Sequence, residues 1–231
     1  MLDVESRLVL VNAIYFKANW KYTFKEQFTA PKPFHVTSTD TVECQMMRIA
    51  GDFNFVANSE LDAKVLELQY KSEGVSMILV LPNDVDGITE LESKISNVNL
   101  SELIRSLSNC KVEVGVPRFK IETSMLLNDV LKKMGLEVAF DDRNANFSKI
   151  ADSDEPLYIS EVIQKAFIEV NEEGSEAAAV SGVLIKKPKS SHGIDVEKFF
   201  ADHPFIFYVV VKHPGESLVN VIFSGRVMQF A

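Results

Sequence analysis

The sequence lacks the motifs of the common classes of enzyme active site. It contains neither GxGxxG nor GxxxxGK[ST], the glycine-rich motifs whose backbone N–H groups hold nucleotide phosphates. Its four histidines are scattered without the spacing of zinc ligands. Ser191, His192 and Asp195 lie on one polar segment, whereas a nucleophilic triad is assembled from separate parts of a fold. We therefore expect no enzyme activity, no cofactor and no metal.

Cysteines and basic clusters are also scarce. The two cysteines, Cys44 and Cys110, are too few for a disulfide-dense scaffold, and we interpret both as small buried apolar residues. The formal net charge is -9, and the only basic cluster is the segment KKPK at Lys186–Lys189. A surface that binds nucleic acid needs clustered Lys and Arg. We therefore expect no nucleic-acid partner.

No apolar run is long enough to span a bilayer, so we expect no membrane association. The first six residues, MLDVES, have neither the basic lead nor the apolar core of a signal peptide. The chain then enters a near-continuous apolar strand at Arg7–Phe16, a pattern typical of a strand buried on both faces of a sheet. We expect that residues which belong before this strand in the fold are not part of the chain.

Strand patterns dominate the rest of the sequence. Apolar or alternating runs bounded by turn residues predict strands at Thr41–Ile49, Phe53–Asn58, Ala63–Tyr70, Val75–Pro82, Lys111–Thr123, Phe205–Val211 and Leu218–Val227. Helical patterns are confined to Ile88–Ile95, Ser101–Leu107 and Ser124–Met134, the last of which Gly135 would end. With 46% hydrophobic and 25% charged residues, the 231-residue chain can bury one sizeable core. We predict a single, strand-dominated α+β domain over residues 1–231.

The stretch Glu172–Ile185, EEGSEAAAVSGVLI, fits neither a strand in a sheet nor an ordinary loop. It follows the strand candidate ISEVIQKAFIEVN without a turn, and it has no apolar face to bury. Ordinary loops carry Pro, Asn, Asp and Gly at turn positions. The composition favours a segment that is suited to be a strand but is not yet paired in a sheet. A flexible linker would explain the small residues but not the positions of the glutamates.

Four separated segments resemble the serpin family. They are NAIYFKANW at Asn12–Trp20, PRFKIETSMLLNDVLKKMGL at Pro117–Leu136, EVNEEGSEAAAVS at Glu169–Ser181 and FFADHPFIFYVV at Phe199–Val210. They are similar to the family's central strand, the following strand and helix, the hinge, and the signature near the C-terminus. Because they occur in the family's order, the chain resembles the C-terminal portion of a serpin without its N-terminal helices and strands. The resemblance implies an incomplete multi-sheet serpin fold, with mixed and antiparallel sheets and few helices.

The resemblance also implies a mechanism. Serpins are serine protease inhibitors whose exposed bait loop is cleaved and then inserts as an extra strand into the main sheet, which traps the protease at its acyl stage. Here the hinge and reactive-centre loop would occupy residues 173–198. The flanking strands would be Arg7–Phe16 and Tyr158–Glu172. The implied partner is a target serine protease in a covalent 1:1 complex, and the full-length protein would be a monomer.

The hinge distinguishes inhibitors from other serpins. Because a strand alternates its faces, every second residue of the inserted hinge would face the core, namely Ser175, Ala177, Ala179 and Ser181. All four are small and uncharged, whereas Glu176 and Ala178 would lie on the solvent face. Gly174 gives the pivot its backbone freedom. Burying an unpaired charge is costly, so this hinge favours an inhibitor. The alternatives are a non-inhibitory serpin (a chaperone or binding protein) and an inactive truncated product.

The reactive bond should lie downstream of the hinge. The family's usual spacing from Glu172 falls on Pro188, which is unsuited to donate a scissile carbonyl. We expect cleavage between Lys189 and Ser190, since a basic residue precedes a small one there. The runner-up is the bond between Lys186 and Lys187. A lysine before the bond implies a trypsin-like protease.

Five further positions carry over from the family one at a time. Asn12 aligns with the asparagine beneath the strands that part, and Gln164 stands where a histidine partner is usual. Trp20 aligns with the aromatic residue where the loop first enters the sheet. Glu172 aligns with an acid that pairs with a basic residue, which here is Arg118.

Two sequons begin at Asn99 and Asn146 and fit a secreted, extracellular glycoprotein. A signal peptide is not observable in the chain.

Overall fold

The computed structural model describes residues 7–150, 157–174, 196–213, 215 and 218–230. The chain divides into two compact units. Unit 1 comprises Met1–Phe16 and Lys120–Ile168, and unit 2 comprises Lys17–Phe119 and Glu169–Ala231. Strands predominate over helices in the described residues, which confirms the predicted α+β class. That residues 1–231 make one domain stays a prediction.

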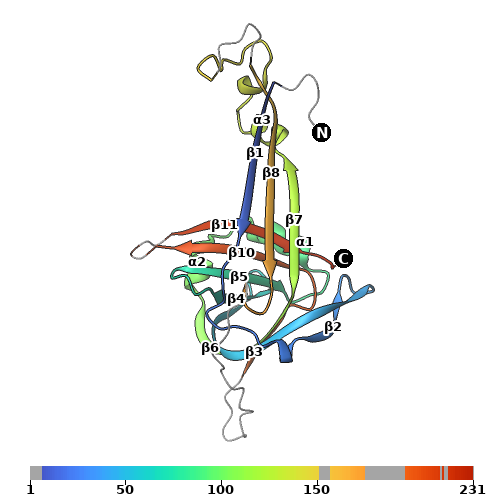
Figure 1. The fold of residues 1–231 in the computed structure, drawn as a ribbon. Coiled ribbons are helices and arrows are strands. Elements are labelled where there is room, and N and C mark those ends of the chain that lie inside the picture. The colour runs from blue at the N-terminus through green and yellow to red at the C-terminus, as the bar shows by residue number, and fades with distance from the viewer. Residues whose placement is uncertain (1–6, 151–156, 175–195, 214, 216–217, 231) are drawn as a thin grey trace, which may run out of the picture. The chain divides into compact units, whose positions relative to one another are not determined.

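Unit 1 is built on a three-stranded sheet with the order β1-β8-β7 (Figure 1). β1 (Leu8–Phe16) runs parallel to β8 (Ile159–Val170), and β7 (Phe119–Leu126) lies on the other side of β8. After β7 come α3 (Asn128–Lys133) and a 3-10 helical turn, Val138–Phe140. In the register of the parallel pair, Asn12 stands opposite Gln164. The two strands expected to flank an inserted loop are therefore direct neighbours.

The expectation that Arg7–Phe16 is buried on both faces is wrong for the described residues. Leu10, Val11 and Tyr15 of β1 are 44%, 64% and 61% exposed. Among the described residues β1 pairs with β8 alone, so its other edge has no strand partner. The strand therefore has the composition of a buried strand in an exposed setting.

Unit 2 contains an eight-stranded sheet with the order β11-β10-β5-β4-β3-β6-β9, and β2 pairs with β3 beside this path (Figure 1). Its strands are β2 (Ala30–His35), β3 (Thr41–Asn58), β4 (Ala63–Gln69), β5 (Val75–Pro82), β6 (Ser108–Pro117), β9 (Glu197–Phe200), β10 (Phe205–Lys212) and β11 (Val219–Val227). The β4–β5 and β10–β11 pairs are antiparallel, as the turn residues between them predict. A single 3-10 turn, Glu26–Phe28, precedes β2.

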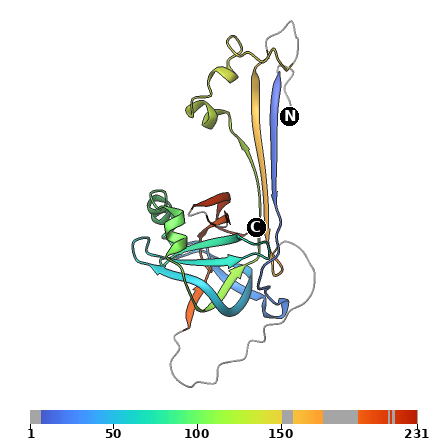
Figure 2. The same cartoon turned by 90° about the vertical axis from the view of Figure 1, so that its left-hand side faces the viewer.

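Two short helices, α1 (Ile88–Ile95) and α2 (Leu100–Arg105), cover part of this sheet (Figure 2). Leu91 of α1 and Ile104 of α2 pack in one cluster with Val65 and Ile78 of the sheet, and all four are buried. Because the helices present apolar residues on one face and charged residues on the other, that cluster forms a closed core. Unit 2 thus has a hydrophobic core of its own.

Two predicted strands, Thr41–Ile49 and Phe53–Asn58, are one strand, β3. The glycine and aspartate between them read as a turn, but both pair with β6: Gly51 lies opposite Val112, and Asp52 lies opposite Lys111. The side chains of Asp52 and Lys111 also form an ion pair at 3.0 Å. A partner strand with matching residues therefore overrides the local turn signal.

The predicted strand Lys111–Thr123 is two strands, β6 and β7, which lie in different sheets. β6 ends at Pro117, which has no N–H group to donate to a ladder. Arg118 lies between the strands, and its N–H donates to the carbonyl of Gln45 at 2.8 Å. Continuous alternation in the sequence concealed this passage from one sheet to another.

The predicted helix Ser124–Met134 begins later, because Ser124–Leu126 belong to β7. The amide side chain of Asn128 donates to the carbonyl of Ser160 and accepts from the N–H of Val162, so β8 fixes the start of α3. Gly135, with φ of 98°, ends the helix as predicted.

Two strands were not predicted, β2 and β9. β2 contains Pro31 and Pro33, which argue against a strand unless it lies at an edge. It does lie at an edge, since β3 is its one partner among the described strands. β9 is four residues long and too short for a periodic signal.

Candidate functional site

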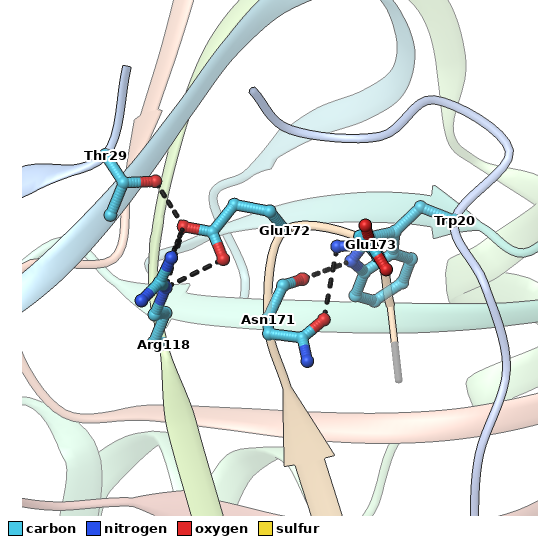
Figure 3. Close-up of polar contacts among 6 residues, drawn as sticks. All are labelled: Trp20, Thr29, Arg118, Asn171, Glu172 and Glu173. Atoms are coloured by element: carbon cyan, nitrogen blue, oxygen red, sulfur yellow. Dashed lines mark hydrogen bonds and ion pairs between the residues drawn. The ribbon is translucent and has the colours of Figure 1, made fainter. Parts of the chain in front are cut away.

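β8 ends in a tight turn, Asn171–Gly174, which is the base of the predicted hinge (Figure 3). The N–H of Gly174 donates to the carbonyl of Asn171 at 3.2 Å, and the N–H of Asn171 donates back to the carbonyl of Gly174 at 3.3 Å. The side-chain oxygen of Asn171 accepts from the N–H of Glu173 at 3.1 Å. The chain therefore reverses its direction within four residues. We call these residues the hinge turn.

The side chain of Glu172 leaves the hinge turn and points toward Arg118 and Thr29 (Figure 3). The Nε of Arg118 donates to both carboxylate oxygens at 2.7 Å, and the hydroxyl of Thr29 donates to Oε1. The ion pair expected between Glu172 and Arg118 is therefore present. The Glu172 side chain is 4% exposed and the Arg118 side chain 42%, so a buried carboxylate is neutralised by a half-exposed cation.

The environment of Glu172 stabilises its charged form. Burial raises the pKa of the carboxyl, but the hydrogen bonds from Arg118 and Thr29 outweigh burial and hold the pKa below its ordinary value of 4.5. The carboxylate is therefore ionised at neutral pH and depends on both donors. Loss of either donor would leave a buried charge partly unpaired.

Trp20 braces the other side of the hinge turn (Figure 3). Its indole Nε1–H donates to the carbonyl of Asn171 at 2.9 Å, and its ring stacks on Tyr70 with centroids 4.3 Å apart. The Trp20 side chain is 1% exposed, and Phe24 meets it edge-on. An indole held both by stacking and by a hydrogen bond has one well-defined orientation. The aromatic residue expected at the entry of the loop thus contacts the hinge directly.

Backbone hydrogen bonds continue this bracing. The N–H of Trp20 donates to the carbonyl of Glu173 at 2.9 Å, and the N–H of Phe24 donates to the carbonyl of Glu172 at 2.9 Å. The segment Lys17–Phe24 is itself attached to β4, because the N–H of Lys21 donates to the carbonyl of Gln69 at 2.8 Å. The hinge turn is therefore connected to the large sheet through this segment.

Gly174 is required where it stands, for two reasons. Its φ is 110°, a conformation that residues with a side chain rarely adopt. A Cβ there would also lie 2.2 Å from the carbonyl oxygen of Ala18 and 2.7 Å from the nitrogen of Trp20. The close approach of another backbone is thus a second reason for a glycine at this position, and its role as a pivot stays a prediction.

The predicted pair Asn12 and Gln164 lies in unit 1. The two residues stand opposite each other in the parallel β1–β8 pair, and the Asn12 side chain is exposed. Their role in the parting of these strands stays a prediction.

Several predicted residues lie outside the described residues. They are Ser175, Glu176, Ala177, Ala178, Ala179 and Ser181 of the hinge, and Lys186, Lys187, Lys189 and Ser190 of the two candidate bonds.

Both sequon asparagines are exposed. Asn99 is the N-cap of α2, and its side-chain oxygen accepts from the N–H groups of Ser101 and Glu102. Asn146 accepts from the N–H and the hydroxyl of Ser148 within a loop. In both side chains the oxygen is the acceptor, and the amide nitrogen, to which a glycan would be attached, is the other polar atom. Glycosylation at either site stays a prediction.

Cys44 is buried as expected, whereas Cys110 is only partly buried. Burial, with the nearby Asp202 and Glu43, raises the pKa of the Cys44 thiol to about 11, so it stays protonated at neutral pH. Among the described residues no group of three His, Cys, Asp or Glu side chains could hold a metal ion. The helices within the described ranges are all too short or too polar to cross a membrane.

Sequence reasoning missed three residues of the site: Thr29, Tyr70 and Asn171. Asn171 had a readable signal, an asparagine with glycine three positions later, which is typical of a turn closed by the asparagine side chain. Thr29 and Tyr70 had none, since Thr29 reaches Glu172, and Tyr70 reaches Trp20, from distant parts of the chain.

Comparisons with known proteins agree on one family. The family model described as "Serpin (serine protease inhibitor)" matches residues 1–230. Alaserpin of Manduca sexta is 44% identical over 229 residues, which cover 99% of this chain and 56% of alaserpin. Leukocyte elastase inhibitor A of Rattus norvegicus is 39% identical over 233 residues, which cover 98% of this chain and 59% of that protein.

Two solved structures extend the likeness to the fold. Serpin48 of the insect Tenebrio molitor is 36% identical, with a TM-score of 0.80, and the match covers 100% of this chain and 58% of Serpin48. Uncleaved ovalbumin is 34% identical, also with a TM-score of 0.80, over 99% of this chain and 56% of that chain. The chain thus spans somewhat more than half the length of the relatives it matches. It belongs to the serpin family.

Proposed function

We propose that this chain carries the bait loop and hinge of an inhibitory serpin that traps a trypsin-like serine protease by inserting its cleaved loop into the β1–β8–β7 sheet. The matching family model is described as one of serine protease inhibitors. Relatives named as inhibitors include the leukocyte elastase inhibitor A of Rattus norvegicus and antichymotrypsin-2 of Bombyx mori, which is 38% identical. Such a protein acts on a protease by being cleaved, and it catalyses no reaction of its own.

The observation that carries the proposal is the register of the hinge turn. The antiparallel bridge between Asn171 and Gly174 would be the first residue pair of a hairpin. If the pairing continues, Ser175 comes to lie opposite Val170, and Ala177 opposite Ile168. Residues directly opposite each other in an antiparallel pair point to the same face. Val170 and Ile168 are both 1% exposed, so the small, uncharged hinge residues would enter the buried face.

The parallel β1–β8 pair gives the inserting strand its place. β1 and β8 are paired with each other from Val9 to Phe16 in an unbroken register, so no strand separates them in this structure. Insertion requires that this pair part and that each strand bond to the loop instead. A cleaved loop that bonds on both edges gains two ladders for the one that is lost, and this gain would drive the trapping.

The alternative is a non-inhibitory serpin. One solved relative, human thyroxine-binding globulin, is named for a bound ligand and shares 28% identity with a TM-score of 0.82. The hinge argues against this alternative, since Glu176 is its only charged residue between Ser175 and Ser181. Glu176 would lie opposite Glu169, which is exposed, and hence on the solvent face. Insertion would bury no charge from the hinge.

The target follows from the residue before the scissile bond. We propose the bond between Lys189 and Ser190, with the bond between Lys186 and Lys187 as the runner-up. A protease pocket that contains a carboxylate accepts a lysine, because an unpaired charge on either side of the contact is costly. The partner would be a trypsin-like protease in a covalent 1:1 complex with a monomeric inhibitor.

The compartment also belongs to the proposal. Two exposed sequons favour an extracellular glycoprotein. One relative at 36% identity, of Tachypleus tridentatus, is named "Intracellular coagulation inhibitor 2", so the family name alone does not decide the compartment. Secretion is tested by the mass of the protein exported from a eukaryotic cell.

The decisive experiment joins residues 1–231 to the N-terminal portion of alaserpin and mixes the chimera with trypsin. We expect a complex that survives a denaturing gel, and a released peptide that begins at Ser190 by mass spectrometry. A peptide that begins at Lys187 would move the bond to the runner-up. Cleavage without a complex would favour the non-inhibitory alternative. If the chimera traps trypsin and residues 1–231 alone are only digested, the chain alone is an inactive truncated product.

A further inference from the structure

Asn171 takes part in four hydrogen bonds at the hinge turn. Its N–H, its carbonyl and its side-chain oxygen are all engaged, and the carbonyl accepts from both Gly174 and Trp20. We propose that Asn171 is a positioning residue, whose side chain holds the hinge turn in the register from which the loop enters the sheet. The consequence for trapping rests on the proposed function, whereas the positioning itself does not.

The side chain is the specific element of this arrangement. Any residue at this position could supply the backbone N–H and carbonyl of the bridge, but the bond to the N–H of Glu173 needs a short side chain with an acceptor oxygen. Asn, Asp and Ser can make this bond, and alanine cannot. Without it, the N–H of Glu173 has no acceptor within the turn, and the two central residues lose the contact that fixes their orientation.

The orientation matters because the two central residues carry every other attachment of the turn. The Glu172 carboxylate must point to Arg118 and Thr29, while the backbone carbonyl of Glu172 accepts from the N–H of Phe24. The carbonyl of Glu173 must point to the N–H of Trp20. These bonds diverge from adjacent residues, so a rotation of the peptide unit between them would break several at once. The single bond from the Asn171 side chain therefore selects one orientation for all of them.

A turn held in this orientation shortens the time that insertion needs. The bridge between Asn171 and Gly174 already has the antiparallel pairing of an inserted hairpin, so pairing can extend from it without a search for register. Whether the protease is trapped depends on the rate of insertion relative to the rate at which the acyl link is hydrolysed. A loosened turn slows insertion and leaves hydrolysis unchanged, so more inhibitor is consumed for each protease trapped.

Trp20 makes the positioning measurable in the 231-residue chain itself. It is the only tryptophan in the sequence, it is 1% exposed, and its indole bonds to Asn171. We expect Asn171→Ala to increase the quenching of Trp20 fluorescence by acrylamide by about twofold or more, because local opening exposes a buried ring. Asn171→Asp and Asn171→Ser should quench like the unchanged chain, since both restore the acceptor oxygen.

Asn58→Ala is the matched control. The Asn58 side-chain oxygen accepts from the N–H of Leu61 at 2.9 Å, a bond of the same kind beside the start of β4, whereas Trp20 contacts Tyr70 beyond the end of β4. We expect Asn58→Ala to leave the quenching unchanged. Equal quenching for Asn171→Ala and the unchanged chain, or equal exposure in the Ala, Asp and Ser variants, would overturn the assignment.

A second measurement needs no variant. By hydrogen exchange of the unchanged chain, the amide of Glu173 should be protected, because Asn171 accepts its hydrogen. Exchange of this amide at the rate of an unstructured peptide would overturn the proposal even if Asn171→Ala does not fold. In the chimera, Asn171→Ala should raise the number of inhibitor molecules consumed per trypsin by roughly threefold to tenfold, as expected from the loss of one hydrogen bond, and Asn171→Asp should restore it. If the unchanged chimera forms no complex, the proposed function fails, and the quenching and exchange results still decide the positioning.

Discussion

The two units contain similar apolar strands in opposite settings. In unit 2, Leu66 and Ile78 are 0% exposed, and strands, α1 and α2 surround the core. In unit 1, no residue of β1 is buried, although LVLVNAIYF is as apolar as the strands of unit 2. β1 has one described strand partner, and β4 and β5 have two each. The difference shows that the composition of a strand indicates which partners it is suited to, whereas its burial depends on the partners that are present.

This contrast explains why the two units serve the proposed mechanism differently. Unit 2 is closed in its described part: each strand there has a partner, and buried polar side chains are satisfied, as Glu67 is by Ser76 and Lys212. The sheet of unit 1 must accept another strand, so it cannot be equally complete before the loop inserts. The hinge turn belongs to the closed unit, which gives the inserting strand a fixed starting point.

The largest expected effect tests the contrast with one substitution at two positions. Leu66→Ala removes a side chain that is 0% exposed, and it should lower the free energy of unfolding by about 2–5 kcal/mol. Leu10→Ala removes one that is 44% exposed, and it should change stability by less than about 1 kcal/mol in the 231-residue chain. Urea denaturation followed through Trp20 measures both. Equal losses at the two positions would mean that β1 is covered in solution.

The fold was predictable where a strand's own pattern decides its structure. β4, β5, β10 and β11 appear within one residue or so of the predicted ranges, because each alternation or apolar run ends at turn residues. The failures occurred where another strand decides. Gly51 and Asp52 stay in β3 because β6 lies opposite them, and the passage between sheets at Arg118 leaves no mark in the alternation. A local sequence pattern covers only neighbouring residues, so it does not show which distant strand will pair with a segment.

The second prediction concerns the ion pair at the hinge turn. Arg118→Ala leaves the buried Glu172 carboxylate with Thr29 alone, and it should cost about 2–3 kcal/mol at pH 7, a value kept modest because Arg118 is half exposed. The folded pKa of Glu172 lies below 4.5, so this stabilisation is fully present above pH 4.5 and is lost as the pH falls through the folded pKa. The difference in unfolding free energy between the two proteins should therefore shrink as the pH falls below 4.5, and urea titrations at a series of pH values can follow it. A difference that does not depend on pH would contradict the role of this charge pair.

The third prediction compares two glycines with similar backbones. Gly174 and Gly135 have φ of 110° and 98°, but a Cβ at Gly174 would meet the backbone of Ala18, whereas a Cβ at Gly135 would meet nothing within 4 Å. Gly135→Ala should cost about 1 kcal/mol from backbone strain alone. Gly174→Ala should cost roughly 1 kcal/mol more, because the hinge turn must shift. It should also increase the quenching of Trp20, which Gly135→Ala should leave unchanged. Equal quenching in both variants would show that the hinge turn tolerates a Cβ.

The smallest expected effect separates the two sequons. Asn99 caps α2, so Asn99→Gln should cost about 1 kcal/mol, whereas Asn146→Gln changes only an exposed loop and should cost less than about 0.5 kcal/mol. In protein secreted from a eukaryotic cell, we expect each substitution to remove the mass of one glycan. An unchanged mass at both positions would remove the support for an extracellular protein.

The candidate site was partly predictable from the sequence. The ion pair of Glu172 with Arg118 and the place of Trp20 at the hinge follow from the family resemblance, because all three residues stand in segments that match it. Thr29 and Tyr70 could not be predicted, since their contacts are made by the fold and not by any local motif. The close approach of Gly174 to Ala18 likewise depends on two segments that are far apart in the sequence.

The central claim, that the hinge inserts with Ser175 toward the buried face, is tested most directly by the stoichiometry of trypsin inhibition for two arginine variants of the chimera. Ser175→Arg would carry an unpaired charge into the buried face, so we expect nearly all of this variant to be cleaved as a substrate. Glu176→Arg would carry the same side chain on the solvent face, so we expect it to trap trypsin with the stoichiometry of the unchanged chimera. Both variants should be cleaved at similar rates, because neither position is near the scissile bond. Equal trapping by the two variants would contradict the assignment of faces and the insertion mechanism built on it.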